Sequence, residues 1–220
     1  MNLRTLSRLG MATLGALFLS SCIGIKSDVR INKDGSGTIK LEYTISRMVE
    51  TMGKLDGNAD QLPLPVSRAD WDRTTARVPG LALTSFSSSR NEQALDVKVD
   101  LTFASTDALL GFLDSTGRSA TLSKDKGSNV LVLRLSEGGG PLDPDLEKLV
   151  KTVFKGYTID MSFTPPSVPT LAFVNGSLQP LPSSPTGKGS VAQGSAVFNA
   201  PVSDILNLRD PLILEITWKE

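Results

Sequence analysis

The single cysteine of the sequence is the residue whose chemistry can be predicted most directly. Cys22 ends the stretch Leu19-Ser20-Ser21-Cys22, in which two small residues precede the thiol. This pattern is typical of a bacterial lipobox, in which the cysteine becomes the first residue after cleavage and its sulfur carries a lipid through a thioether. A lone thiol in an exported chain has no cysteine with which to form a disulfide. We therefore predict that Cys22 is lipidated.

The residues before Cys22 predict a signal peptide over residues 1–21. Arg4 and Arg8 give it a positive start, and the apolar run from Leu9 to Leu19 follows. That run is much shorter than the roughly 20 residues that a membrane-spanning helix needs. The alternative is an ordinary secreted protein whose cysteine lies near the cleavage site by chance.

The composition narrows the chemistry that the chain can perform. It contains 23 Lys and Arg, 23 Asp and Glu, and no histidine. Without histidine there is no Ser-His-Asp or Cys-His system and no histidine-ligated zinc. Proteins that bind nucleic acids usually have a cluster of basic residues on their surface. The equal numbers of basic and acidic residues do not favour such a cluster. We predict no nucleic-acid partner, no metal, no cofactor and no enzymatic activity; a hydrolase using carboxylates such as Asp70 and Asp72 is the remaining enzymatic alternative.

Alternation of apolar and polar residues predicts β-hairpins along the rest of the chain. After the anchor, Val29 and Ile31 alternate with polar residues, and Asp34-Gly35-Ser36-Gly37 supplies a tight reversal before a second alternating run. Further hairpins are predicted at 81–103 and 119–136, and single strands at 157–163 and 212–218.

Apolar residues at helical spacing predict four helices, at about 46–57, 67–77, 105–117 and 143–156. The last is the strongest, because Asp143 is a suitable N-cap and Pro144 suits the first helical position. A weak calcium site at Asp143 and Asp145 is the alternative to capping. The apolar stripe of this helix comprises Leu146, Leu149, Val150, Val153 and Phe154.

Together these elements predict an α+β fold. Residues 22–220 are expected to form a single domain, with an antiparallel sheet built from hairpins and three or four amphipathic helices packed on one face. A loop rich in Pro, Gly and Ser is expected at about 165–190, with a short strand at "LAFV".

The helix predicted at 46–57 provides the candidate ligand site. Its stripe has no aromatic residue, and methionine suits an adaptable apolar surface. Packing into the core is the ordinary role of such a stripe, and a gap that accommodates lipid is the alternative. The candidate apolar ligand face comprises Ile45, Met48, Val49, Met52 and Leu55.

The stretch "SDVRINKDGSGTIKLEYTIS" directly after the lipobox resembles the start of LppM-like bacterial lipoproteins. The strand "MSFTPP" and the following "LAFVNGSL" are similar to a later part of that family. The resemblance implies an α+β domain on the outer side of a membrane, with lipid or glycolipid as its ligand and no catalytic residues.

These observations predict a membrane-anchored envelope lipoprotein that is not an enzyme. Acyl chains on Cys22 would hold it on the non-cytoplasmic side of the cell membrane, or on the outer membrane in a bacterium that has two, because Ile23 and not an acidic residue follows the cysteine. We expect a lipid or another amphipathic ligand. The alternative is a structural or assembly factor that binds another envelope protein.

Overall fold

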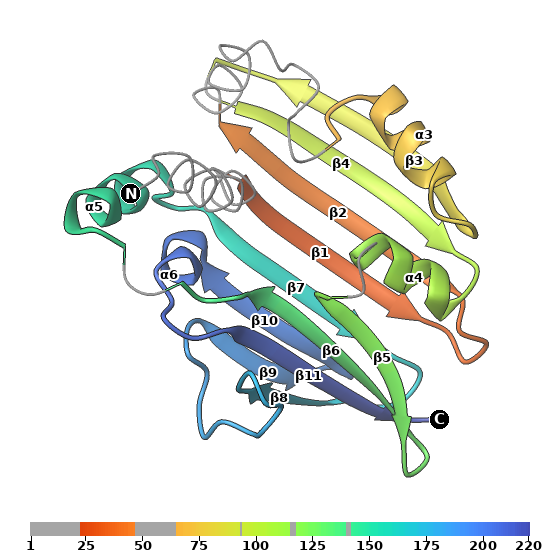
Figure 1. The fold of residues 1–220 in the computed structure, drawn as a ribbon. Helices are drawn as coiled ribbons and strands as arrows, with labels where there is room; N and C mark the ends of the chain where they lie inside the picture. Colours follow the sequence, from red (N-terminus) through yellow and green to blue (C-terminus); the bar gives the residue numbers. More distant parts are fainter. Residues whose placement is uncertain (1–22, 47–64, 93, 115–117, 140–141) are drawn as a thin grey trace, which may run out of the picture.

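A computed structural model describes residues 23–46, 65–92, 94–114, 118–139 and 142–220. These residues form eleven strands and four helices, arranged in two sheets (Figure 1). The strands are β1 (Ile23–Ile31), β2 (Gly37–Ser46), β3 (Leu81–Arg90), β4 (Ala94–Phe103), β5 (Ala120–Asp125), β6 (Ser128–Ser136), β7 (Thr158–Thr164), β8 (Thr170–Val174), β9 (Lys188–Ala192), β10 (Ser195–Pro201) and β11 (Leu212–Lys219). The helices are α3 (Arg68–Ala76), α4 (Thr106–Leu113), α5 (Pro144–Val153) and α6 (Val202–Leu206).

The larger sheet has seven strands in the order β3-β4-β2-β1-β7-β10-β9. Its neighbouring strands are antiparallel with one exception, because β1 and β7 run parallel, with Ile25 opposite Ile159. The prediction of a purely antiparallel sheet is therefore wrong at this pair. Parallel strands begin at the same end of a sheet, so the start of β7 lies beside the start of β1.

The first hairpin is confirmed, together with the turn that the sequence predicted for it. Gly35 has φ +82°, a backbone conformation that residues other than glycine rarely adopt. Strands β1 and β2 pair antiparallel on either side of the turn. The Asp34 carboxylate accepts hydrogen bonds from the backbone N–H and the hydroxyl of Ser36, at 3.0 and 2.6 Å. Because these bonds favour the charged carboxylate, the pKa of Asp34 lies below its ordinary value.

The smaller sheet has four strands in the order β5-β6-β11-β8 and packs against one half of the larger sheet. Phe173 on β8 meets Phe198 on β10 edge to face, with ring centroids 6.1 Å apart. The C-terminal strand β11 is central to this packing. The strand predicted at 212–218 is confirmed. Its inward side is buried, and Ile213 on its other side is fully buried as well. The buried residues on that inward side are Leu212, Leu214, Ile216 and Trp218.

Helices α3 and α4 cover the other half of the larger sheet, over β3 and β4 (Figure 1). Both helices were predicted, at about 67–77 and 105–117. Ser67 accepts from the backbone of Asp70, and Ser105 accepts from that of Ala108. Serine at these positions satisfies a backbone N–H that has no partner within the helix. Trp71 on α3 is buried and its ring lies 6.2 Å from that of Phe112 on α4.

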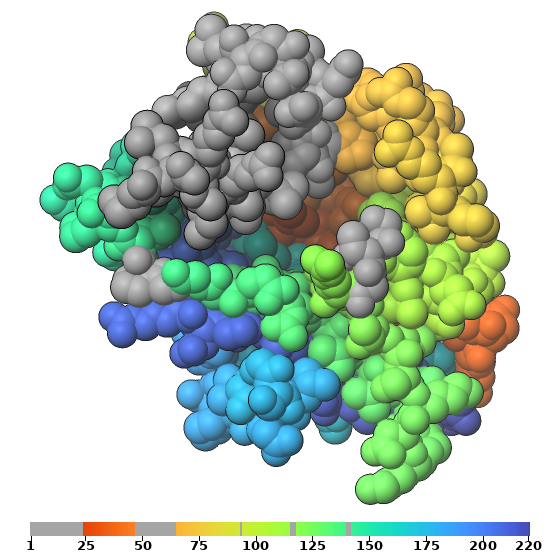
Figure 2. Space-filling model, viewed as in Figure 1, coloured from red at the N-terminus to blue at the C-terminus, as the bar shows by residue number. Residues whose placement is uncertain are grey.

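Helix α5 begins as predicted, with Asp143 accepting from the backbone of Asp145 and Pro144 at its first position. Its packing differs from the prediction. Leu146 and Leu149 are exposed, and the helix projects from the edge of the molecule (Figure 2). Among the predicted stripe residues, Val150 and Val153 are half-buried, and only Phe154 is fully buried. This helix therefore does not lay its whole apolar stripe on the sheet.

The predicted α+β class is contradicted. Strands make up 50% of the described residues and helices 18%, so the fold is mostly β. A second sheet takes the place over β7, β10 and β9 that the prediction assigned to amphipathic helices. The physical reason is that an alternating segment needs an apolar layer against its inner face, and another sheet provides one as well as helices do.

The segment predicted as a loop at about 165–190 contains more regular structure than its composition suggests. It holds β8, which confirms the short strand at "LAFV", and the first residues of β9. An isolated bridge between Val174 and Pro180 closes a turn after β8. Strand β9 and the β9–β10 hairpin were not predicted.

A close approach of the chain at Gly37 yields a testable prediction. A Cβ atom at this position would overlap the carbonyl oxygen of Arg30 and the ring of Phe103. Gly37→Ala is expected to lower the free energy of unfolding by about 2–3 kcal/mol. The Arg30 carbonyl that the new Cβ atom overlaps belongs to β1, so it cannot move without disturbing the hydrogen bonds between β1 and β2. Urea unfolding followed by circular dichroism measures the loss.

The matched control is Gly139→Ala, because a Cβ atom at Gly139 would meet nothing within 4 Å. That change is expected to alter the free energy of unfolding by less than about 0.5 kcal/mol. Equal effects of the two substitutions would contradict the close approach at Gly37.

Candidate functional site: a polar hollow on the open sheet face

The larger sheet has one covered face and one open face. Along each strand, successive side chains point to opposite faces. In β2, Ile39, Tyr43 and Ile45 are buried against the covering layers, while Lys40 and Glu42 are exposed on the other side. The other central strands alternate in the same way. The open face is therefore polar and accessible to solvent.

Charged side chains on the open face form two rows across the strands. The first charge row runs through Lys98 on β4, Glu42 on β2, Lys26 on β1 and Asp160 on β7. The second charge row lies two residues further along and comprises Asp100, Lys40 and Asp28. In both rows the sign alternates from strand to strand. Opposite charges on directly paired residues stabilise a sheet modestly.

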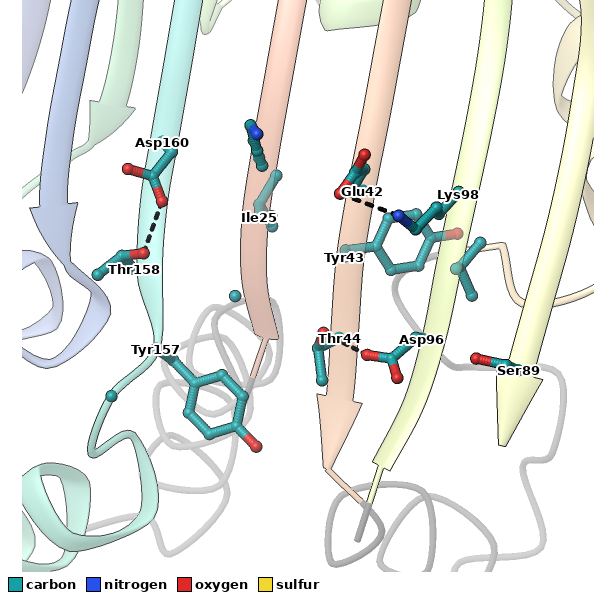
Figure 3. Close-up of a pocket in the computed structure, with 14 residues that line it drawn as sticks. Ile25, Glu42, Tyr43, Thr44, Ser89, Asp96, Lys98, Tyr157, Thr158 and Asp160 are labelled. Carbon is teal, nitrogen blue, oxygen red and sulfur yellow. Dashed lines mark hydrogen bonds and ion pairs between the residues drawn. The ribbon is translucent and has the colours of Figure 1, made fainter. Parts of the chain in front are cut away.

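A hollow of about 550 Å³ lies over the end of the sheet at which β1 and β7 begin. The first charge row forms one side of it, and Thr44, Asp96, Thr158 and Tyr157 line the rest, together with further residues of β1, β2, β3 and β4 (Figure 3). Strands that are distant in the sequence therefore supply the lining. The hollow combines ammonium, carboxylate and hydroxyl groups with two tyrosines, Tyr157 and the buried Tyr43.

Hydrogen bonds and an ion pair hold the carboxylates of the hollow in place. The Thr44 hydroxyl donates to Asp96 at 2.6 Å, and the Thr158 hydroxyl donates to Asp160 at the same distance. The Asn199 side chain also donates to Asp160. Glu42 forms an ion pair with Lys98 at 3.5 Å. Each carboxylate therefore has at least one partner and still retains capacity to accept further hydrogen bonds.

The ring of Tyr157 lies against the backbone at Gly24. A Cβ atom at Gly24 would stand 3.3 Å from the ring carbon Cδ1 of Tyr157, so glycine lets the ring approach the strand closely. The ring and the polar groups of the hollow can thus contact the same small molecule. An aromatic face next to hydroxyl, carboxylate and ammonium groups suits a ligand that has both C–H surface and several hydroxyls.

The residues predicted as sites are located as follows. Cys22 lies outside the described residues, and so do Met48, Val49, Met52 and Leu55 of the candidate apolar ligand face. Ile45 lies on β2, where it is fully buried beneath the covering layers. The lipidation site and the remaining four ligand-face residues stay predictions.

Sequence reasoning did not find the hollow. The sequence did contain one relevant signal. The polar positions of the first strands carry charges whose sign changes regularly, and these charges form rows once it is known which strands pair. The pairing of β1 with β7 could not be read from the chain, and this pairing brings Asp160 and Tyr157 to the site.

Three of the carboxylates that the sequence analysis considered as possible sites have structural roles. Asp70 forms a capping box with Ser67 at the start of α3, and its pKa is lowered chiefly by the hydrogen bond from the Ser67 hydroxyl. Asp72 lies 3.6 Å from Arg68 in a surface ion pair. Asp143 caps α5. Within the described residues, no cluster of three or more potential ligands could hold a metal ion.

The comparisons with known proteins add no family to this picture. No protein-family model matches the chain, and no curated protein matches it significantly. The resemblance to LppM-like lipoproteins therefore stays a prediction based on the first hairpin and on the later stretches "MSFTPP" and "LAFVNGSL". Among the helices of the described residues, none has the length and apolar character required to cross a membrane.

Proposed function

We propose that the chain is a non-enzymatic lipoprotein of the bacterial envelope that binds the polar head of an amphipathic lipid in the hollow. Acyl chains on Cys22 would anchor it on the non-cytoplasmic side of the membrane, or on the outer membrane in a bacterium that has two. A glycolipid is the ligand class that best matches the lining.

One observation carries this proposal. Strand β1 begins at Ile23, directly after Cys22, and its residues Gly24 and Lys26 line the hollow. A strand rises about 3.3 Å per residue, so a lipid on Cys22 would lie within about 10–15 Å of the hollow. The anchor would therefore present this end of the sheet to the headgroup layer.

The residues that line the hollow favour a lipid headgroup rich in hydroxyls over one that carries a strong net charge. The first charge row alternates in sign, so the hollow offers neither a basic nor an acidic surface. Sugar hydroxyls can donate to Asp96 and Asp160 and accept from Lys26, while a sugar ring can pack on Tyr157. The carboxylates already have hydrogen-bonding partners, which suits recognition better than proton transfer.

A second candidate function rests on a different feature, the edge of the larger sheet. All five residues of β9 are exposed, and among the strands that the structure describes only β10 pairs with β9. An exposed edge strand can add a strand from another protein. This favours the alternative of a structural or assembly factor that holds another envelope protein.

The ligand proposal is tested by titrating the acyl-free domain, residues 23–220, with extracted envelope lipids and measuring complexes by native mass spectrometry. Lys26→Ala is expected to weaken binding about tenfold, because it removes a charged hydrogen-bond donor worth about 1.4 kcal/mol. Lys40→Ala is the matched control, since Lys40 is an exposed lysine of the same face that does not line the hollow.

Equal binding by the two lysine variants would contradict a ligand site in the hollow. If lipid does not bind the unmodified domain at all, while a second envelope protein is captured along β9, the assembly-factor alternative replaces the proposal.

A further inference from the structure

Helix α5 carries a pair of leucines that are exposed and do not pack into the core. Leu146 is 37% exposed and Leu149 is 55% exposed. Residues three apart are neighbours on one side of a helix, so the two side chains form a continuous apolar surface, which we call the α5 leucine face. The other three large apolar side chains that are exposed in the described residues, Val168, Leu178 and Val191, lie in other parts of the chain.

The second half of α5 is fixed to the body of the protein. Val150 and Val153 pack partly against the core, and Phe154 is 7% exposed. The helix ends there, and Gly156, with φ +84°, turns the chain towards β7. The leucine face is therefore held out from the molecule by a helix that is anchored at its other end.

The parallel pairing of β1 and β7 places this helix at the anchored end of the sheet. Tyr157, four residues after the end of α5, lies against Gly24, two residues after Cys22. A ten-residue helix is about 15 Å long. The leucine face therefore lies within about 25 Å of the start of β1, at the end from which an acyl chain on Cys22 would emerge.

We propose that the α5 leucine face rests in the interfacial layer of the bilayer that holds the acyl chains. This inference depends on the proposed anchor at Cys22. The charges of α5 are consistent with it, because Lys151 pairs with Glu147 at 2.6 Å and Lys148 lies 3.8 Å from Asp145. The helix is thus nearly neutral and would bind through its apolar side chains, as interfacial helices do. Two leucines bind a bilayer weakly, so the helix orients an anchored protein and does not recruit it.

This contact would orient the protein on the membrane. With the anchor at the start of β1 and a second contact at α5, the end of the sheet that carries the hollow would face the headgroups. A protein held by acyl chains alone could rotate freely about its attachment point.

A fluorescent label tests the contact in the full, lipidated protein. Because acylation consumes the single native thiol, a cysteine introduced elsewhere reacts alone. Leu149→Cys, carrying an environment-sensitive nitrobenzoxadiazole label, is reconstituted in phosphatidylethanolamine–phosphatidylglycerol vesicles. The matched control is Val168→Cys, because Val168 is 74% exposed and follows the far end of β7.

We expect the emission of the label at position 149 to shift to the blue and to be quenched by doxyl-labelled lipid, while the label at position 168 keeps its emission in water. Water-like emission at both positions in protein that floats with the vesicles would overturn the α5 inference and leave the anchor intact. A blue shift without quenching by lipid would overturn it as well, because a protein surface would then cover Leu149. Wild-type protein that does not float with the vesicles would refute the proposed anchor itself.

Discussion

Cys22→Ser is expected to release the protein from the membrane completely. A serine hydroxyl cannot form the thioether, so the chain would carry no acyl group. Each buried CH₂ contributes about 0.8 kcal/mol to membrane attachment, and two acyl chains together hold a protein firmly. Partitioning between detergent and aqueous phases after cell lysis measures the change, and metabolic labelling with a fatty acid measures acylation directly.

Ser20→Ala is the control for the anchor experiment, because it keeps a small residue before the cysteine and should leave acylation unchanged. Should the Cys22→Ser protein remain in the detergent phase as fully as the wild type, the lipobox interpretation is wrong. The α5 leucine face alone cannot account for such retention, because two leucines give only weak binding.

Trp71→Ala is expected to have the largest effect on folding stability. Trp71 is 2% exposed, and its indole N–H donates to the Tyr43 hydroxyl at 3.2 Å. That hydroxyl in turn donates to the carbonyl of Pro65. Truncating a buried tryptophan leaves a large cavity, and here it also removes one hydrogen bond, so we expect a loss of about 4 kcal/mol in the free energy of unfolding. Circular dichroism during urea unfolding measures it.

Arg68→Ala in the same helix is the matched control. The Arg68 side chain is 62% exposed and pairs only at the surface with Asp72, so its loss should change stability by less than about 0.5 kcal/mol. A cost below about 1 kcal/mol for Trp71→Ala would show that Trp71 does not join α3 to the sheet.

The burial of Tyr43, the hydrogen-bond partner of Trp71, makes the folding stability depend on pH in the alkaline range. Burial raises the pKa of Tyr43 above its ordinary value of about 10, so the folded protein holds the phenolic proton more tightly than the unfolded chain does. The stability that Tyr43 contributes is therefore fully present below about pH 10 and declines as the pH rises above it. This decline is expected to be smaller in Tyr43→Phe.

The local features of the fold were predictable because each depends on residues close together in the chain. Glycine at position 35 allows the turn of the first hairpin, and serine or aspartate at positions 67, 105 and 143 begins each of three helices as expected. Alternation correctly placed the inward side chains of the strands. These signals identify an element and its inner face.

Alternation does not identify the layer against which an inner face packs. The apolar residues of β6 and β11 would suit a strand of the larger sheet equally well, and they instead form a second sheet that covers part of it. The stripe of α5 shows the same limit, since its spacing predicted burial and Leu149 is exposed. The hollow depends on pairings between distant strands, so its lining could not be assembled from any one segment.

The two charge rows also act against incorrect strand pairing during folding. A one-residue shift between neighbouring strands turns core side chains outwards, whereas a two-residue shift leaves every apolar side chain inside. Shifting β1 by two residues against β2 in one direction would place Lys26 opposite Lys40. In the other direction it would place Asp28 opposite Glu42. Like charges directly opposite each other are destabilising. Repulsion between them therefore disfavours misaligned sheets that would bury the same apolar side chains.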